Sequence, residues 1–200
     1  MSQWYGWMGT ILRINLSTGK IAKEALSEKL ACQFIGGRGL NSKILYDETG
    51  PETDPLGPEN RLIVGTGPTT GTLGLGNSRF TITGKSPLTG ILGDASGGGA
   101  FGAEVKFAGY DHVIVQGQAD KPIYLWIDDG EIKIKDAAHL WGKTTGKRWI
   151  SSGKNWGMKV SKLCPLDQPE KTWSSMRPRF PTTRLCRQRR AWVASWVPRS

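Results

Sequence analysis

Alternating hydrophobic and polar residues mark much of the first 146 positions of the chain as strands. The alternation is clearest over residues 10–16 and 21–26, and Ser17-Thr18-Gly19-Lys20 between them is typical of a hairpin turn. Short apolar or alternating runs predict further strands at residues 61–65, 80–84, 112–116, 122–127 and 131–135. The last two join through Asp128-Asp129-Gly130, which tolerates the positive φ angles of a tight turn.

Few segments carry helical periodicity. Residues 27–35 begin with a Ser-Glu pair and then present one apolar face, which predicts a helix stopped by Gly36-Gly37. Asn41 is in position to cap a second short helix through Tyr46, and residues 103–108 predict a helical turn or two. Cys32 lies near the apolar face of the first helix, which favours a core position over a role as a ligand. The expected class is α+β with β structure in the majority.

Glycine is concentrated in residues 71–102, with the sequence GTLGLGNSRFTITGKSPLTGILGDASGGGAFG. Two glycine-rich loops bracket the short strand at 80–84, and Arg79 stands where the first loop meets that strand. Each glycine loses more backbone freedom on folding than any other residue, so it is usually kept where φ is positive or where the backbone approaches something closely. Two tight turns and a binding loop both fit this composition.

The common nucleotide-binding loops do not fit these glycines. A GxGxxG motif that starts at Gly74 has Arg79 at its third glycine position and is followed by a strand instead of a helix. A Walker loop that ends at Gly84-Lys85-Ser86 has Arg79 at its first glycine position. What remains is an anion cradle: backbone N–H groups in residues 94–102, with Arg79 as a bidentate partner. The residues alone therefore predict binding of a phosphorylated organic cofactor.

Other motifs that carry chemistry are absent from the sequence. No zinc, EF-hand or Ser-His-Asp spacing appears, and His139 is interpreted as structural. The cysteines, Cys32, Cys164 and Cys186, are far apart and form neither a disulfide framework nor a complete metal or cluster site, which favours a reduced cytoplasm. No apolar run of eighteen residues and no basic-then-apolar leader occurs, so we expect neither a membrane span nor a signal peptide.

Charge divides the chain near Gly146. The net charge is +10, but residues 147–200 hold 13 Lys or Arg against two Asp or Glu, and residues 1–146 carry a net charge of −1. Glycine divides the same way, with 25 before position 147 and two after it. The basic part, with its interleaved tryptophans, permits one alternative function, a nucleic-acid-binding module.

Several motifs in the first part resemble one family. They are YGWMG at 5–9, ILRINLSTG at 11–19, IGGRGL at 35–40, DPLGPEN at 54–60, KSPLTG at 85–90, GAEVKFAGYD at 102–111 and KPIYLWIDDGEIKIKDAAHLWGK at 121–143. Together they resemble the N-terminal domain of the tungsten-containing aldehyde ferredoxin oxidoreductases, from about Tyr5 to Gly146. Several separate motifs agree in order and spacing.

The resemblance implies a tungsten bis-pterin cofactor (tungstopterin) with Mg²⁺ on its phosphates. It maps a pterin-contacting arginine onto Arg79 and the contacts to the phosphates and magnesium onto Ser96 and Gly98. Ser96 departs from the asparagine often found there, but a backbone carbonyl contact survives that change. The family oxidises an aldehyde and water to a carboxylic acid and passes electrons through a [4Fe-4S] cluster to ferredoxin. The cluster and the substrate pocket belong to later domains, so no catalytic residue and no metal ligand is assigned to this chain.

The codons suggest why the resemblance stops. Read out of frame, with the third base of one codon joined to the first two of the next, LDQPEKTWS at 166–174 can encode GPAGENLV. In the same frame, RAWVASWVPRS at 190–200 can encode GLG-x-VMGSKK, with glycines at Trp192-Val193 and Trp196-Val197 that the code forces. A third string, at 152–158, can encode REELGD. All three resemble the continuation of the same family.

We therefore interpret the chain as two parts. Residues 1–146 are a truncated tungstopterin-binding N-terminal domain, and residues 147–200 are an out-of-frame tail after a single-base insertion or deletion near residues 146–148. The tail has the composition of a segment that cannot bury a core, so we expect it to be disordered. Its basic charge is then a by-product of codon reading, and the chain is expected to be inactive by itself. A domain completed by a separate gene product would instead need an ordered tail.

Overall fold

The computed structural model describes residues 5–128 and 130–141, which form two β-sheets and three α-helices. The larger sheet has six strands in the order β2-β1-β6-β3-β4-β5, and the smaller one pairs β7 with β8. The strands are β1 (Thr10–Asn15), β2 (Ile21–Ala25), β3 (Arg61–Thr66), β4 (Phe80–Lys85), β5 (Leu92–Gly97), β6 (His112–Gln116), β7 (Ile123–Asp128) and β8 (Glu131–Asp136). The helices are α1 (Glu28–Phe34), α2 (Gly37–Glu48), α3 (Ala100–Phe107) and the 3₁₀ turn η1 (Ala138–Leu140).

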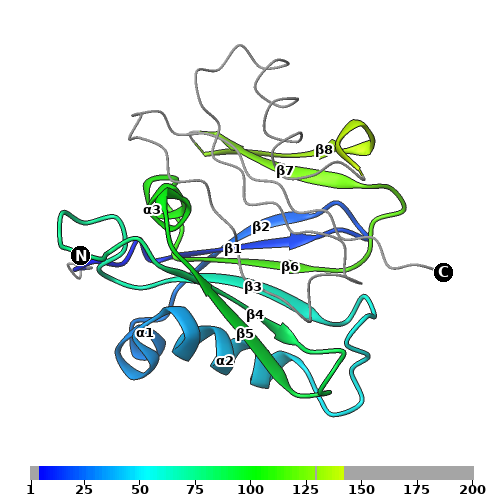
Figure 1. Ribbon diagram of the computed structural model, residues 1–200, viewed down its shortest axis with the longest axis horizontal. Helices are drawn as coiled ribbons and strands as arrows, with labels where there is room; N and C mark the ends of the chain where they lie inside the picture. The colour runs from blue at the N-terminus through cyan, green and yellow to red at the C-terminus, as the bar shows by residue number, and fades with distance from the viewer. Residues whose placement is uncertain (1–4, 129, 142–200) are drawn as a thin grey trace.

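Helices and the small sheet cover the six-stranded sheet on both faces (Figure 1). α1 and α2 lie on one face, whereas α3 and the β7–β8 hairpin lie on the other. Alternation along each strand divides the hydrophobic side chains between two cores. On β6, for example, Val113 and Val115 join the core under α3, while Ile114 joins the core under α2. Every strand predicted from the pattern is present within a residue or two of its expected ends, and the strand-rich α+β class is confirmed.

The second helix is longer than the sequence pattern predicted. α2 begins at Gly37, so Arg38-Gly39-Leu40 forms its first turn, and Asn41 lies inside the helix instead of capping it. Asn41 is fully buried, and its Nδ2 donates to the carbonyl oxygens of Ile63 and Thr81 and to Oγ1 of Thr83. This amide is therefore used to join the helix to two strands, which a local capping pattern does not reveal.

The first helix buries less than the sequence pattern predicted. α1 ends at Phe34, and Ile35 follows it with a φ of 63° and 61% of its surface exposed. Cys32 is exposed, so its predicted core position is wrong. The buried residue of α1 is Ala31. A seven-residue helix presents a narrow buried stripe, and Cys32 and Ile35 fall outside it.

The second glycine-rich segment is mostly regular structure, contrary to the prediction of a loop over residues 94–102. β5 continues to Gly97 and α3 begins at Ala100, so Gly98 and Gly99 alone connect them. Gly97 leaves room for the ring of Phe80 on the neighbouring strand, because a Cβ at position 97 would lie 2.5 Å from that ring. That ring in turn packs edge-on against Phe101 of α3.

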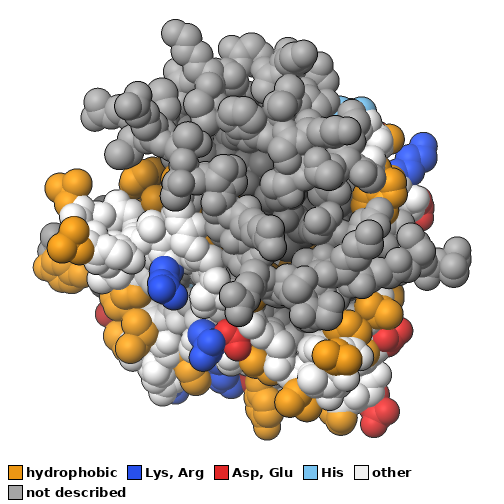
Figure 2. All heavy atoms as spheres, viewed as in Figure 1, with side chains coloured by type: hydrophobic (Ala, Val, Ile, Leu, Met, Phe, Trp, Pro, Cys, Tyr) orange, Lys and Arg blue, Asp and Glu red, His pale blue; other side chains and the backbone are white. Residues whose placement is uncertain are grey.

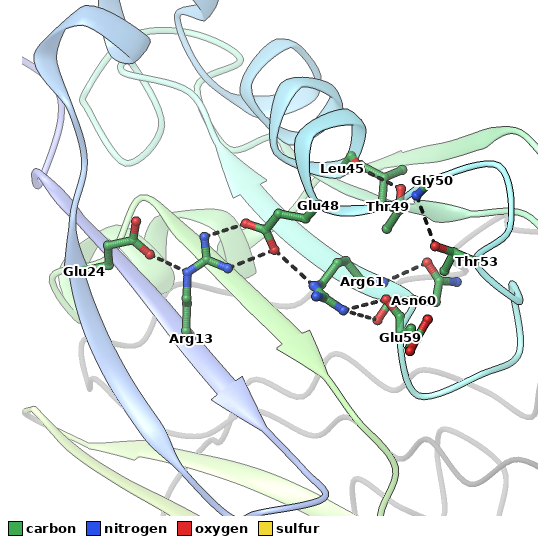
Figure 3. Close-up of polar contacts among 10 residues, drawn as sticks. All are labelled: Arg13, Glu24, Leu45, Glu48, Thr49, Gly50, Thr53, Glu59, Asn60 and Arg61. Atoms are coloured by element: carbon green, nitrogen blue, oxygen red, sulfur yellow. Dashed lines mark hydrogen bonds and ion pairs between the residues drawn. The ribbon is translucent and has the colours of Figure 1, made fainter.

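One ion-pair network fastens the C-terminal end of α2 to the sheet (Figure 3). The carboxylate of Glu48 accepts from both terminal nitrogens of Arg13, at 3.0 and 2.6 Å, and from Nε of Arg61 at 3.0 Å. Arg13 also pairs with Glu24 on β2. Burial opposes the charge of Glu48, but the hydrogen bonds from the two guanidinium groups outweigh it and hold the pKa of that carboxyl below its ordinary value.

Replacement of Glu48 by glutamine is expected to lower the free energy of unfolding by about 1 kcal/mol at neutral pH. Because the pKa of Glu48 is lower in the folded state, its stabilisation is present above the unfolded-state pKa and is lost as the pH falls through the folded value. The wild-type advantage should therefore shrink below about pH 4 in urea titrations. Glu52→Gln, at an exposed loop position, is the control. A Glu48→Gln difference that is independent of pH would contradict this assignment.

Within the described residues, no helix is long and apolar enough to cross a membrane. The predicted disordered tail at 147–200 lies outside the residues that the structure describes.

Candidate functional site

One corner of the large sheet brings together glycines and polar residues from several elements. We call it the glycine corner; it comprises Gly36, Gly37, Gly67, Arg79, Ser96, Gly98 and Gly99. The start of α2 reaches the end of β3, because a Cβ on Gly36 would lie 2.7 Å from the carbonyl oxygen of Thr66 and 3.3 Å from Cα of Gly67. The start of α3 lies against the loop before β4, because a Cβ on Gly102 would lie 3.1 Å from the carbonyl oxygen of Arg79.

Arg79 is exposed and its backbone is fixed. Its carbonyl oxygen accepts a 3.1 Å hydrogen bond from Oγ1 of Thr70, which also accepts from the N–H of Gly67. The β4–β5 ladder pairs Phe80 with Gly97, so the next residues along each strand, Arg79 and Gly98, are neighbours at the corner. The structure thus brings these two predicted site residues together and leaves the guanidinium open to solvent.

Ser96 is exposed on β5, which is the edge strand of the sheet. Hydrogen-bonded and non-hydrogen-bonded residue pairs alternate along an antiparallel ladder. In the β4–β5 ladder, Ser86 and Ile91 form a hydrogen-bonded pair directly after Lys85–Leu92, because the N–H of Ser86 donates to the carbonyl oxygen of Ile91. By this alternation Ser96 belongs to a non-bonded pair, so its own N–H and C=O face the open edge. Its Oγ lies 3.3 Å from Oγ1 of Thr81. A backbone carbonyl is therefore available at the predicted position.

Two helices begin at the glycine corner. Gly36 is the N-cap of α2 and Gly99 is the N-cap of α3, with φ angles of 157° and 96°, and neither supplies a side-chain cap. The first N–H groups of a helix have no partner within the helix, and the helix dipole adds partial positive charge there. Together with the Arg79 guanidinium, these helix ends make the corner suited to an anion such as phosphate.

Arg38 adds a second guanidinium, which the sequence motifs did not assign to the site. It lies in the first turn of α2 and pairs with Asp94 of β5 at 2.6 Å, yet its side chain remains 67% exposed. The sequence could have indicated Arg38, because it directly follows Gly36-Gly37. That position becomes informative only when the two glycines are interpreted as the start of a helix instead of its end. The ion pair joins α2 to the edge strand beside Ser96.

The described residues contain no group of three or more His, Cys, Asp or Glu that could hold a metal ion. Cys164 and Cys186 lie outside the described ranges. His139 is exposed and lies edge-on to the ring of Tyr124, with the two ring centroids 6.4 Å apart. A cavity of about 560 Å³, between the end of β1 and the start of β7, lies at the opposite end of the strands from the glycine corner and shares no residue with it. The groups that the described part of the chain places at the corner are thus the Arg79 side chain, the Ser96 carbonyl and backbone N–H groups at two helix starts.

Hydrophobic side chains are exposed near the corner and elsewhere. Leu73 and Leu75, in the loop between β3 and β4, are fully exposed, and Ile91 at the tip of the β4–β5 hairpin is 67% exposed. On the face drawn in Figure 2, hydrophobic side chains gather along the margin of the described part, with basic and acidic side chains among them. Apolar surface of this kind commonly marks a site of contact with further protein.

Comparison with known proteins places these observations in one family. The sequence model described as "Aldehyde ferredoxin oxidoreductase, N-terminal domain" matches residues 11–160. The tungsten-containing aldehyde ferredoxin oxidoreductase of Pyrococcus furiosus is 45% identical over 162 residues, which are 81% of this chain and 27% of that protein. The protein of the same name from Thermococcus kodakarensis is 48% identical over 143 residues, 72% of this chain and 24% of that protein.

Among solved structures, the active-site complex BamBC of benzoyl coenzyme A reductase, in complex with 1,5-dienoyl-CoA, is similar in fold and sequence. The TM-score is 0.75 at 34% identity, over 76% of this chain and 23% of that one. The chain thus spans about a quarter of the length of the relatives that it matches.

Proposed function

The chain belongs to the aldehyde ferredoxin oxidoreductase family, and from that premise we propose that residues 1–146 are its N-terminal cofactor-binding domain. In this proposal the glycine corner holds the phosphate end of a tungstopterin. The observation that carries the proposal is the meeting of Arg79 and Gly98 with two helix starts that lack side-chain caps.

The residues of the corner fit such a group. Arg79 would bind phosphate oxygens in a bidentate manner, and the N–H groups around Gly98 and Gly99 would donate to the same anion. A Cβ added to either glycine would meet no atom within 4 Å among the described residues, so the backbone is open to approach. Ser96 would offer its backbone carbonyl to Mg²⁺, a hard cation that prefers oxygen.

When bound, the tungsten and its dithiolene ligands supply the redox chemistry. The residues of this chain bind and orient the phosphate end of the cofactor, while an aldehyde substrate, a [4Fe-4S] cluster and ferredoxin belong to the whole enzyme. Since the chain covers about a quarter of its relatives, oxidation of an aldehyde to a carboxylic acid is proposed for that whole enzyme and not for this chain alone. The exposed Leu73 and Leu75 are consistent with a surface that further protein covers.

We also propose that residues 147–200 are read out of frame after a single-base change near residues 146–148. The support is the match of three decoded strings to the continuation of the family, and the proposal explains the basic charge without a nucleic-acid ligand. None of the relatives named above is described as a nucleic-acid-binding protein. Resequencing of the locus is expected to reveal one base gained or lost there. Codons at the locus that do not encode the three family strings in the shifted frame would refute this part of the proposal.

Replacement of Arg79 by alanine is expected to weaken the binding of magnesium pyrophosphate, a probe for the phosphate end of the cofactor, by about tenfold or more. Titration calorimetry at low and moderate salt would measure the dissociation constant. Lys20→Ala, which removes one exposed positive charge from the β1–β2 turn, is the matched control and is expected to change it little. If both substitutions raised the dissociation constant equally, the loss of net charge would explain the result, and the proposed site would be contradicted.

A further inference from the structure

His112, at the start of β6, is fully buried, and neither of its ring nitrogens has a hydrogen-bond partner among the described residues. The side-chain oxygen of Asn41 is also buried and unpaired within that part of the chain, although its nitrogen is hydrogen-bonded. A buried polar atom without a partner is destabilising, and such atoms are rare in native proteins. Two side chains that carry such atoms and lie close together are expected to form a hydrogen bond with each other.

Gly65 indicates that these two groups face each other. A Cβ on Gly65 would lie 2.2 Å from Oδ1 of Asn41 and 2.7 Å from Cδ2 of His112. The amide oxygen and one edge of the imidazole therefore share the small volume above this glycine. A half turn of the ring about its Cβ–Cγ bond exchanges Cδ2 with Nδ1 and brings a nitrogen to that edge.

We infer that Nδ1–H of His112 donates a hydrogen bond to Oδ1 of Asn41 above Gly65, and that His112 thereby acts as a positioning residue for Ser96. The second half of this inference rests on the proposed function of the glycine corner. The bond gives Asn41 a partner for its oxygen as well as its nitrogen, and it gives the buried imidazole a partner for its proton.

The environment of the ring favours its neutral form. Burial lowers the pKa of His112 to about 4, the charge of the adjacent Asp111 opposes that shift, and the charge of Lys106 adds to it. A neutral imidazole carries one N–H donor, and the identity of the protonated nitrogen depends on the acceptor that it finds. Asn41 Oδ1 is that acceptor.

The strand register connects His112 to the corner. His112 is opposite Gly65, Gly65 is opposite Thr81, and Thr81 is opposite Ser96, so the four residues form a row across β6, β3, β4 and β5. Asn41 lies over this row and donates to the carbonyl oxygen of Thr81 at 3.1 Å. The hydroxyl of Thr81 then contacts that of Ser96 at 3.3 Å. Fixing the Asn41 amide therefore fixes the strand that supports Ser96.

Nuclear magnetic resonance of the wild-type protein tests the hydrogen bond without any substitution. Long-range ¹H–¹⁵N correlation spectra distinguish the Nδ1–H and Nε2–H tautomers of a neutral histidine. We expect an Nδ1–H tautomer for His112, with a proton that exchanges slowly with solvent. An Nε2–H tautomer would overturn the inference whatever the fate of the proposed function.

The positioning role is tested by the dissociation constant for magnesium pyrophosphate. His112→Leu is expected to raise it by about threefold to tenfold, the range for loss of one hydrogen bond. Ile114→Ala is the matched control, because Ile114 is buried on the same strand and the same face but lies outside the polar row. It is expected to destabilise the fold and leave the dissociation constant unchanged. Equal changes in both variants would make His112 merely structural, whereas failure of the wild-type protein to bind would contradict the proposed function instead.

Discussion

Asp111→Asn is expected to lower the free energy of unfolding by about 3–5 kcal/mol, the cost of breaking a buried ion pair from one side. Asp111 is fully buried at the N-terminal end of β6, and its Oδ1 lies 2.5 Å from Nζ of Lys106, which is itself 4% exposed. The carboxylate also accepts from the N–H groups of Met8 and Gly9 at 3.0 and 2.7 Å. Loss of its charge leaves an ammonium group in the interior without a counterion and loosens the segment before β1.

Asp47→Asn is the matched control for this prediction. Asp47 forms an ion pair with Lys43 at the same distance, 2.5 Å, but its side chain is 48% exposed. Exposed pairs contribute little, so this control is expected to change the free energy of unfolding by less than about 1 kcal/mol in urea titrations. If both substitutions changed the free energy of unfolding by less than about 1 kcal/mol, the buried Lys106–Asp111 ion pair would not stabilise the fold as we expect.

Gly65→Ala is expected to lower the free energy of unfolding by about 3 kcal/mol, near the upper end for overpacking of a core. The new methyl group would lie 2.2 Å from Oδ1 of Asn41, and Nδ2 of that amide is held by three hydrogen bonds. The Asn41 side chain therefore cannot move away from the new methyl group without leaving buried polar groups unpaired. Thermal unfolding of the variant measures the cost.

Gly50→Ala is the control, because a Cβ at Gly50 would meet no atom within 4 Å among the described residues. Its effect is expected to stay within about 0.5 kcal/mol. A Gly65→Ala variant as stable as this control would mean that the amide of Asn41 is not held in place above the glycine.

The strands were predictable because their hydrophobic alternation is local. Residues 10–16 and 21–26 carry a period of two whether or not the rest of the chain is folded, and both became strands. The helix starts were not predictable in the same way. Gly36-Gly37 fits a helix stop from its composition, but Gly37 is the first residue of α2, because the packing of that helix on β3 and β4 decides its position.

The candidate site was only partly within reach of the sequence. The family resemblance pointed to Arg79, Ser96 and Gly98, and the strand register places all three at one corner. Arg38 and His112 were missed because their relevance arises from contacts between distant segments. Arg38 reaches Asp94 across more than fifty residues, and His112 meets Asn41 only after β6 and β3 have paired. No local pattern reports such contacts.

The binding surface itself gives the most direct test of the account. Amide chemical shifts of the 200-residue protein, followed during a titration with magnesium pyrophosphate, would locate the bound anion residue by residue. Saturable shifts are expected at Arg79, Ser96, Gly98 and Gly99 and in the first turns of α2 and α3. Shifts confined to other parts of the chain, or none at all, would contradict the assignment of the glycine corner as the phosphate site of the cofactor.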